Sequence, residues 1–205
     1  MKRAEKMVVK TYVSGQIIKK YQLPLSEIDE LNKCYEKNVN LLKTKSHRLA
    51  GRIKSELDVV NLVIDLKIMN SLKKRMNDYM MSLNNFDMIN SPEKNLEILS
   101  MWINDMKPGE YNPPHTHHDS TGWSTVLFLK VPKFLDDSKY SHKFKDGNIG
   151  FQWIQHGFRP GNKFFAPEVG DFYIFEASHT HFVMPFKTMK DNDIRRSMSF
   201  NFVLK

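Results

Sequence analysis

The sequence predicts a mainly β fold with flanking helices, and two observations support that prediction. After residue 98, most of the chain consists of short runs rich in β-branched and aromatic residues, separated by turn residues. About eight strands of this kind are typical of a sandwich or barrel. Before residue 98, long stretches instead repeat apolar residues at the helical period of about 3.6 residues. Jelly rolls pair such strands with few open edges and include metal-binding proteins.

The N-terminal region is predicted to begin with a hairpin and a helix. Residues 8–20 are of strand type, with a turn at Ser14 and Gly15. Ser26, followed three residues later by Asp29, is typical of a helix N-cap and predicts a helix that runs to about Leu42. We expect the N-terminal helices to pack on one sheet of the β fold.

A second helix is predicted to start at Ser55 and Asp58, which have the spacing of a capping box. Apolar residues then follow a helical period, which indicates core packing: Val59, Leu62, Val63, Leu66, Met69, Leu72, Met76 and Met80. Beyond them, Asn84, Asn85 and the pair 91–92 predict a loop before the first long strand.

The rest of the chain is predicted to be strands separated by turns and one long polar loop. Turns are expected at 107–109 and 169–170, where a glycine ends each short segment. The loop, 136–147, could lie over the mouth of a site. The predicted strands are 97–106, 124–131, 147–155, 163–167, 171–176 and 193–204.

Length and composition indicate one domain. A chain of 205 residues is long enough to bury a sizeable core, and we expect residues 1–98 to support a β core formed by residues 99–205. The single cysteine, Cys34, excludes a disulfide within the chain and is typical of a reducing cytosol. No apolar run is long enough to span a membrane, and the first residues lack the apolar region of a secretory signal. We therefore expect a cytoplasmic protein with no membrane partner.

The net charge of +8 and the pI near 9.4 are compatible with an acidic partner. However, the basic run 73–75 lies on a helix-like stretch and is typical of a solvated face. The sequence contains no zinc-finger spacing and no basic motif interleaved with aromatic residues. Nucleic acid is therefore a less favoured partner.

Histidines cluster twice, within residues 114–119 and 178–181. Alternate residues of a strand point to the same face, so His115 and His117 would project together, and so would His117 and Asp119. Either pair could supply two ligands to iron, zinc, copper or nickel, with His181 as the third ligand and other positions left open. The remaining histidines are expected to lie outside such a site: His47, His118, His142, His156 and His179.

Arg195 and Ser197 follow the second histidine cluster on a predicted strand. Their spacing places them on one strand face. There, a guanidinium can pair with a carboxylate through two hydrogen bonds, and a hydroxyl can donate a third. The opposite face is predicted to be mostly core: Arg196, Met198, Phe200 and Phe202. The pattern therefore predicts a carboxylate-binding site close to the metal site.

The ordered motifs after residue 99 resemble the Fe(II)- and 2-oxoglutarate-dependent dioxygenase superfamily. More narrowly, they resemble the 2-oxoglutarate/iron oxygenases common in tailed bacteriophages and marine bacteria. The segments that carry the resemblance are 102–104, 112–117, 123–132, 170–175, 181–185 and 195–201. In that narrower family the first two ligands usually read His-x-His and the distal histidine precedes x-Val-x-Pro, as His115, His117 and His181 do. Most of the superfamily has His-x-Asp or His-x-Glu, which residues 117–119 also fit.

The resemblance implies a double-stranded β-helix, which is a cupin-like jelly roll. It implies Fe(II) held by the three histidines and 2-oxoglutarate held by Arg195 with the help of Ser197. We expect three residues on neighbouring strands to line the pocket: Asn104, Trp123 and Tyr173.

The activity that the resemblance implies is hydroxylation of a substrate with 2-oxoglutarate and O2, releasing succinate and CO2. A protein side chain, as in prolyl hydroxylases, is the first expected substrate and nucleic acid the second. If the protein is phage-encoded, the cytoplasm would be that of the bacterial host. Two alternatives are a cupin-like three-histidine metalloenzyme that does not use 2-oxoglutarate, and a non-enzymatic binding or structural module of a phage. The sequence does not predict an oligomeric state.

Overall fold

The computed structural model describes residues 10–13, 16–45, 52–85, 95–117, 121–135, 146–155 and 159–205. The helical elements are α1 (Leu25–Asn38), the 3-10 turn η1 (Val39–Leu41), α2 (Val60–Val63) and α3 (Ile68–Asn85). The strands are β1 (Lys10–Val13), β2 (Ile17–Gln22), β3 (Ser55–Asp58), β4 (Leu96–Met106), β5 (Asn112–His115), β6 (Trp123–Lys130), β7 (Ile149–Gln155), β8 (Arg159–Phe165), β9 (Asp171–Glu176), β10 (His181–Val183) and β11 (Arg195–Leu204).

The strands form two antiparallel sheets that pack together as a jelly roll. The larger sheet has the order β1-β2-β9-β6-β11-β4-β3, and the smaller has the order β5-β10-β7-β8. Aromatic and aliphatic side chains fill the space between them, with Phe128 and Tyr173 from the larger sheet meeting Phe151 and Phe165 from the smaller. The predicted double-stranded β-helix is therefore confirmed.

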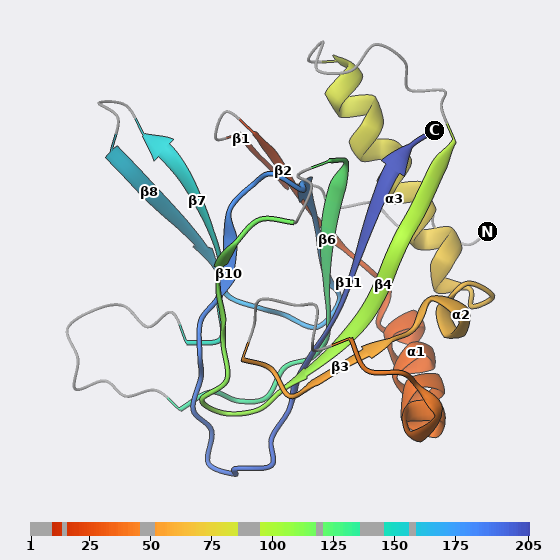
Figure 1. The fold of residues 1–205 in the computed structure, drawn as a ribbon, viewed down its shortest axis with the longest axis vertical. Coiled ribbons are helices and arrows are strands. Elements are labelled where there is room, and N and C mark those ends of the chain that lie inside the picture. The colour runs from red at the N-terminus through yellow and green to blue at the C-terminus, as the bar shows by residue number, and fades with distance from the viewer. Residues whose placement is uncertain are drawn as a thin grey trace, which may run out of the picture.

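The helices cover the outer face of the larger sheet, on the side away from the smaller sheet (Figure 1). Helix α3 presents a buried stripe that includes Leu72, Met76 and Tyr79, and helix α1 buries Ile28, Leu31 and Tyr35. These residues share one core with the outward-facing apolar residues of β11: Met198, Phe200 and Phe202. No helix among the described residues is long and apolar enough to cross a membrane.

Most predicted elements are confirmed, although several of their boundaries differ from the prediction. Strands β1 and β2 pair as a hairpin, while Ser14 and Gly15 lie outside the described residues. The predicted turns contain glycines with positive φ, 81° at Gly109 and 88° at Gly170, a conformation that glycine adopts without steric cost. Strand β8 begins at Arg159, earlier than residue 163, where the sequence pattern placed its start.

The predicted helix start at Ser55 is wrong, because residues 55–58 form strand β3. That strand pairs with β4 at the edge of the larger sheet. The Asp58 carboxylate accepts a hydrogen bond from the Val60 backbone N–H at 3.1 Å, directly before the short helix α2, whose N-cap residue is Val59. The predicted stripe of buried apolar residues is present, but it is divided between the two helices α2 and α3.

The N-cap of the first helix and the end of α3 also differ from the prediction. Helix α1 starts directly after Pro24, and Ser26 lies inside it without capping any N–H. The helical path then continues through η1 to Leu41, close to the predicted end. Asn84 and Asn85 belong to the last turn of α3, because favourable packing of the helix outweighs the weak turn preference of asparagine.

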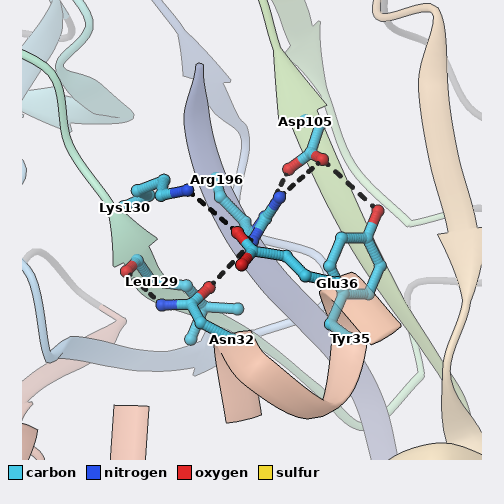
Figure 2. Close-up of polar contacts among 7 residues, drawn as sticks. All are labelled: Asn32, Tyr35, Glu36, Asp105, Leu129, Lys130 and Arg196. Atoms are coloured by element: carbon cyan, nitrogen blue, oxygen red, sulfur yellow. Dashed lines mark hydrogen bonds and ion pairs between the residues drawn. The ribbon is translucent and has the colours of Figure 1, made fainter. Parts of the chain in front are cut away.

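A polar cluster centred on Arg196 links helix α1 to the larger sheet (Figure 2). The guanidinium of Arg196 makes two hydrogen bonds to Asp105, at 2.6 and 3.0 Å, and further bonds to Asn32 and Glu36. It also lies 4.5 Å from the centre of the Tyr35 ring. Burial by itself would lower the pKa of Arg196, but the Asp105 and Glu36 carboxylates raise it above the usual value. Arg196 is therefore a structural residue, on the outer face that the sequence predicted.

Candidate metal and co-substrate site

Three histidines converge where β5, the edge strand of the smaller sheet, pairs with β10. His115 ends β5 and is the direct cross-strand partner of His181, the first residue of β10. His117 lies two residues beyond the end of β5, where its backbone N–H donates to the carbonyl of Ala177 at 3.1 Å. One ring nitrogen from each histidine lies within 4.8 Å of the others. This group could therefore hold a metal ion, although the strand ends before His117.

The protonation of His115 and His181 suits metal binding. Nδ1 of His115 lies 2.7 Å from the carbonyl oxygen of Pro113, and Nδ1 of His181 lies 2.9 Å from that of His179. A carbonyl only accepts hydrogen bonds, so each Nδ1 carries the proton and each Nε2 keeps a free lone pair. Burial lowers the pKa of His115 and, more strongly, that of His181. Both rings are therefore neutral near pH 7, the form that binds metals.

Both ring nitrogens of His117 are in contact with polar side chains. Its Nε2 lies 2.8 Å from the Ser124 hydroxyl, and its Nδ1 lies 3.2 Å from the amide nitrogen of Asn201. The carbonyl oxygen of Asn201 is buried and has no hydrogen-bond partner among the residues that the structure describes. Turning the amide over would let that oxygen accept a hydrogen bond from the Nδ1–H of His117 and would leave Nε2 as the acceptor of the Ser124 hydroxyl. A metal ion would replace one of the two contacts, and the other would fix the ring.

The remaining sequence candidates take different positions. His179 is fully buried against Phe151, and its backbone carbonyl orients His181. His179 therefore lies behind the candidate ligands and is not one of them. Five residues lie outside the described part of the chain, including the alternative carboxylate ligand: His47, His118, Asp119, His142 and His156.

A cavity of about 670 Å³ opens between the two sheets and contains the histidines. Arg195, Ser197 and Asn104 also line it, as predicted. The other two residues expected in the pocket do not line this cavity. Trp123 stacks on Phe202 in the outer core. Tyr173 packs between the sheets.

Arg195 is a buried cation without an anionic partner in the described structure. Its side chain is 2% exposed, lies 4.6 Å from the centre of the Phe128 ring and contacts the sulfur of Met106. Its Nε and one terminal nitrogen have no hydrogen-bond partner. Burial lowers the pKa of Arg195 to about 9, which leaves it charged at pH 7. A buried unpaired charge is costly, so Arg195 could receive an anion here.

Among the polar residues that line the cavity, sequence reasoning assigned no role to Glu56, Ser124 or Asn201. Asn201 was part of a quoted motif but had no assigned role. Glu56 fell in a segment that was predicted to start a helix. No spacing rule connects these residues with the histidines, because their contacts depend on how strands that are distant in the sequence pair.

The jelly roll places the chain in the cupin-like fold class, and its cavity holds three histidines that could bind a metal ion and one buried arginine. A family model described as "Putative 2OG-Fe(II) oxygenase" matches residues 100–201. The chain belongs to the 2OG-Fe(II) oxygenase superfamily, and it is an enzyme of the dioxygenase class. Fe(II) and 2-oxoglutarate are the cofactor and co-substrate of this family. No functionally curated protein matches the sequence.

Solved structures share the fold at low sequence identity. A prolyl-4-hydroxylase from Pseudomonas putida is 13% identical, with a TM-score of 0.54 over 96% of this chain and 92% of that chain. The viral collagen prolyl hydroxylase vCPH from Paramecium Bursaria Chlorella virus-1 is also 13% identical, with a TM-score of 0.56 over 91% and 96%. The carbocyclase SnoK from nogalamycin biosynthesis is 11% identical, with a TM-score of 0.58 over 90% and 78%.

Proposed function

We propose that this enzyme is a 2-oxoglutarate-dependent hydroxylase in which His115, His117 and His181 hold Fe(II). Three imidazoles that converge on one point suit a divalent first-row metal. Two of them are held by backbone carbonyls, which fixes the ring orientation. Bound Fe(II) would supply the activation of O2.

The observation that carries the proposal is the unpaired guanidinium of Arg195 in the same cavity. A dicarboxylic co-substrate bound to the metal at one end must place its second carboxylate elsewhere in the cavity. Arg195 offers an unpartnered nitrogen fork for that carboxylate, and we propose that the hydroxyl of Ser197 adds a third donor. The low polarity around Arg195, with Phe128 and Met106 in contact, would strengthen this ion pair.

We further propose a protein side chain as the substrate, with proline first. The support is likeness of fold to two prolyl hydroxylases over more than nine-tenths of each chain. The cavity agrees with this, because about 670 Å³ is large enough for 2-oxoglutarate together with one side chain.

Anaerobic titration of the Fe(II)-loaded protein with 2-oxoglutarate tests the site. We expect a saturable visible charge-transfer absorption, which Ala at His181 should abolish together with metal binding. Arg195→Met should keep the metal and weaken 2-oxoglutarate binding roughly 10- to 150-fold, the value of a charged hydrogen-bonded contact of about 1.5–3 kcal/mol. Arg52→Met, which changes an exposed arginine, is the matched control. Unchanged 2-oxoglutarate affinity in Arg195→Met would exclude the assigned role.

The substrate is tested separately with proline-rich peptides. We expect mass spectrometry to find one added oxygen atom on proline, in step with succinate formation. The same peptides with alanine in place of proline are the control. Equal succinate formation with both peptide sets, and no modified proline, would reject proline as the substrate. That result would not affect the proposed metal and 2-oxoglutarate sites.

A further inference from the structure

Glu56 brings a carboxyl group into the cavity from the edge of the larger sheet. Glu56 lies on β3, and its direct cross-strand partner on β4 is Asn104. On the other side of β4, Asn104 pairs with Ser197 of β11. The three side chains therefore form one row on the inner face, and all three line the cavity. The next residue, Leu57, packs against the outer core, which fixes the inward direction of Glu56.

The Glu56 carboxyl group is buried and lacks a counter-ion among the described residues. The residue is 1% exposed, and Oε2 has no hydrogen-bond partner. The nearest cation along the chain that lines the same cavity is Lys45, which already pairs with Asp58 at 3.0 Å. A bound cation would stabilise this buried carboxyl group more than it would stabilise an exposed carboxyl group, because water does not compete for the interaction.

Asn104 adds a second unsatisfied acceptor beside Glu56. Its carbonyl oxygen is buried and has no hydrogen-bond partner in the described part of the chain, and the residue is 8% exposed. Two neighbouring acceptors without donors suit a group that carries several N–H bonds. Ammonium and guanidinium groups have this character, whereas a hydroxyl or a single amide N–H could satisfy only one acceptor.

Once 2-oxoglutarate occupies Arg195, Glu56 is the one remaining carboxyl, lysine or arginine side chain without an ion-pair partner among the described residues that line the cavity. We propose that Glu56 and Asn104 form a substrate subsite that binds a cationic nitrogen group, an ammonium or a guanidinium, of the molecule to be hydroxylated. This inference rests on the proposed function and adds a basic side chain or amine to the expected substrate. For a peptide substrate, the basic group would belong to a residue beside the hydroxylated one or to that residue itself.

The electrostatics of the site are consistent with this role. Burial, with a smaller contribution from the Glu110 carboxylate, raises the pKa of Glu56 to about 7. A cation placed next to Glu56 would favour its ionised form and lower that pKa again. Binding of the cation would therefore relieve the unfavourable burial of the carboxylate.

The test measures binding of small probes to the protein loaded with Mn(II) and 2-oxoglutarate in the absence of oxygen. The cationic probes are Nα-acetyl-lysinamide and Nα-acetyl-argininamide. Their neutral isosteres are Nα-acetyl-norleucinamide and Nα-acetyl-citrullinamide. Calorimetry is used on the wild type, on Glu56→Gln, and on Glu110→Gln as a control that removes a half-buried carboxylate outside the cavity lining. Metal and 2-oxoglutarate affinities are measured on each variant first.

We expect at least one cationic probe to bind the wild type about tenfold or more tightly than its isostere. Glu56→Gln should remove that preference while metal and 2-oxoglutarate affinities stay within twofold, and Glu110→Gln should keep the preference. Equal binding of charged and neutral probes, or no binding of either, would overturn the subsite. A preference that survives in Glu56→Gln would also overturn it. Failure of the wild type to bind 2-oxoglutarate would instead reject the proposed function.

Discussion

Arg195 and Arg196 are adjacent in the sequence, and their replacement by methionine should change the stability of the metal-free protein in opposite directions. Arg195 is a buried cation without an anionic partner among the described residues, whereas Arg196 makes a bidentate ion pair with Asp105. Both side chains are almost completely buried. Methionine keeps much of the volume of either side chain and removes the charge.

The magnitudes follow from the environments. A fall in the pKa of Arg195 from 12.5 to about 9 corresponds to a burial cost of about 5 kcal/mol at roughly 1.4 kcal/mol per pKa unit. The contact with the Phe128 ring offsets about 2 kcal/mol of this cost. Arg195→Met should therefore raise the free energy of unfolding by about 3 kcal/mol. Arg196→Met should lower it by about 3–5 kcal/mol, because it leaves the Asp105 carboxylate buried without its partner.

Urea denaturation of the metal-free proteins at neutral pH measures these free energies. A second series of denaturations contains Mn(II) and 2-oxoglutarate, the latter at about 100 times its Kd for the wild type. Binding of 2-oxoglutarate should stabilise the wild type by about 2.7 kcal/mol and Arg195→Met by much less. If Arg195→Met destabilises the metal-free protein as Arg196→Met does, Arg195 has a structural partner and the argument for an anion site fails. If 2-oxoglutarate stabilises Arg195→Met fully, that arginine does not bind it.

Three further predictions address the metal site, the acidic subsite and the domain. Ala at Ser124 and Ala at Asn201 should have different effects on metal affinity measured by competition with a chelator. One of these residues holds the His117 ring in place when the metal is bound, and its loss should weaken metal binding about 10- to 100-fold. The other contacts the ring nitrogen that the metal would occupy, and its loss should not weaken metal binding. Equal metal affinities in both variants would contradict these roles. The wild type should lose stability relative to Glu56→Gln as pH rises from about 4.5 to about 7, because the folded pKa of Glu56 lies above its ordinary value. The difference should reach about 3 kcal/mol, and a pH-independent difference in urea titrations would refute it. A fragment of residues 99–205 should fail to fold, because it lacks β1, β2 and β3 of the larger sheet. A dispersed NMR spectrum of that fragment would show that the β core folds without the N-terminal region.

The metal site was more predictable than its surroundings because its residues are marked by local spacing. The alternation of Arg195, Arg196 and Ser197 assigned the inner and outer strand faces correctly, since side chains alternate along any strand. His115 and His117 were paired by the same rule. They do converge, although His117 lies beyond the strand and reaches the site through a backbone bond to Ala177.

The error at residues 55–58 has a different cause. A short polar segment carries little periodicity, and the helix-capping spacing of Ser55 and Asp58 outweighed it in the prediction. Pairing with β4 makes this segment a strand, and β4 lies about 40 residues further along the chain. Because a strand is completed by its neighbours, local sequence could not reveal that Glu56 points into the cavity.

The sequence by itself determined the jelly-roll class, the outer apolar faces and the residues from which the three-histidine group is drawn, because each depends on residue type and short-range periodicity. Only the tertiary structure decided which charges are paired. It gives Arg196 a partner in Asp105, 91 residues away, and leaves Arg195 and Glu56 buried without an ion-pair partner among the described residues. Whether a buried charge is structural or available to a ligand depends on contacts between distant segments, and those contacts form only when the sheets close.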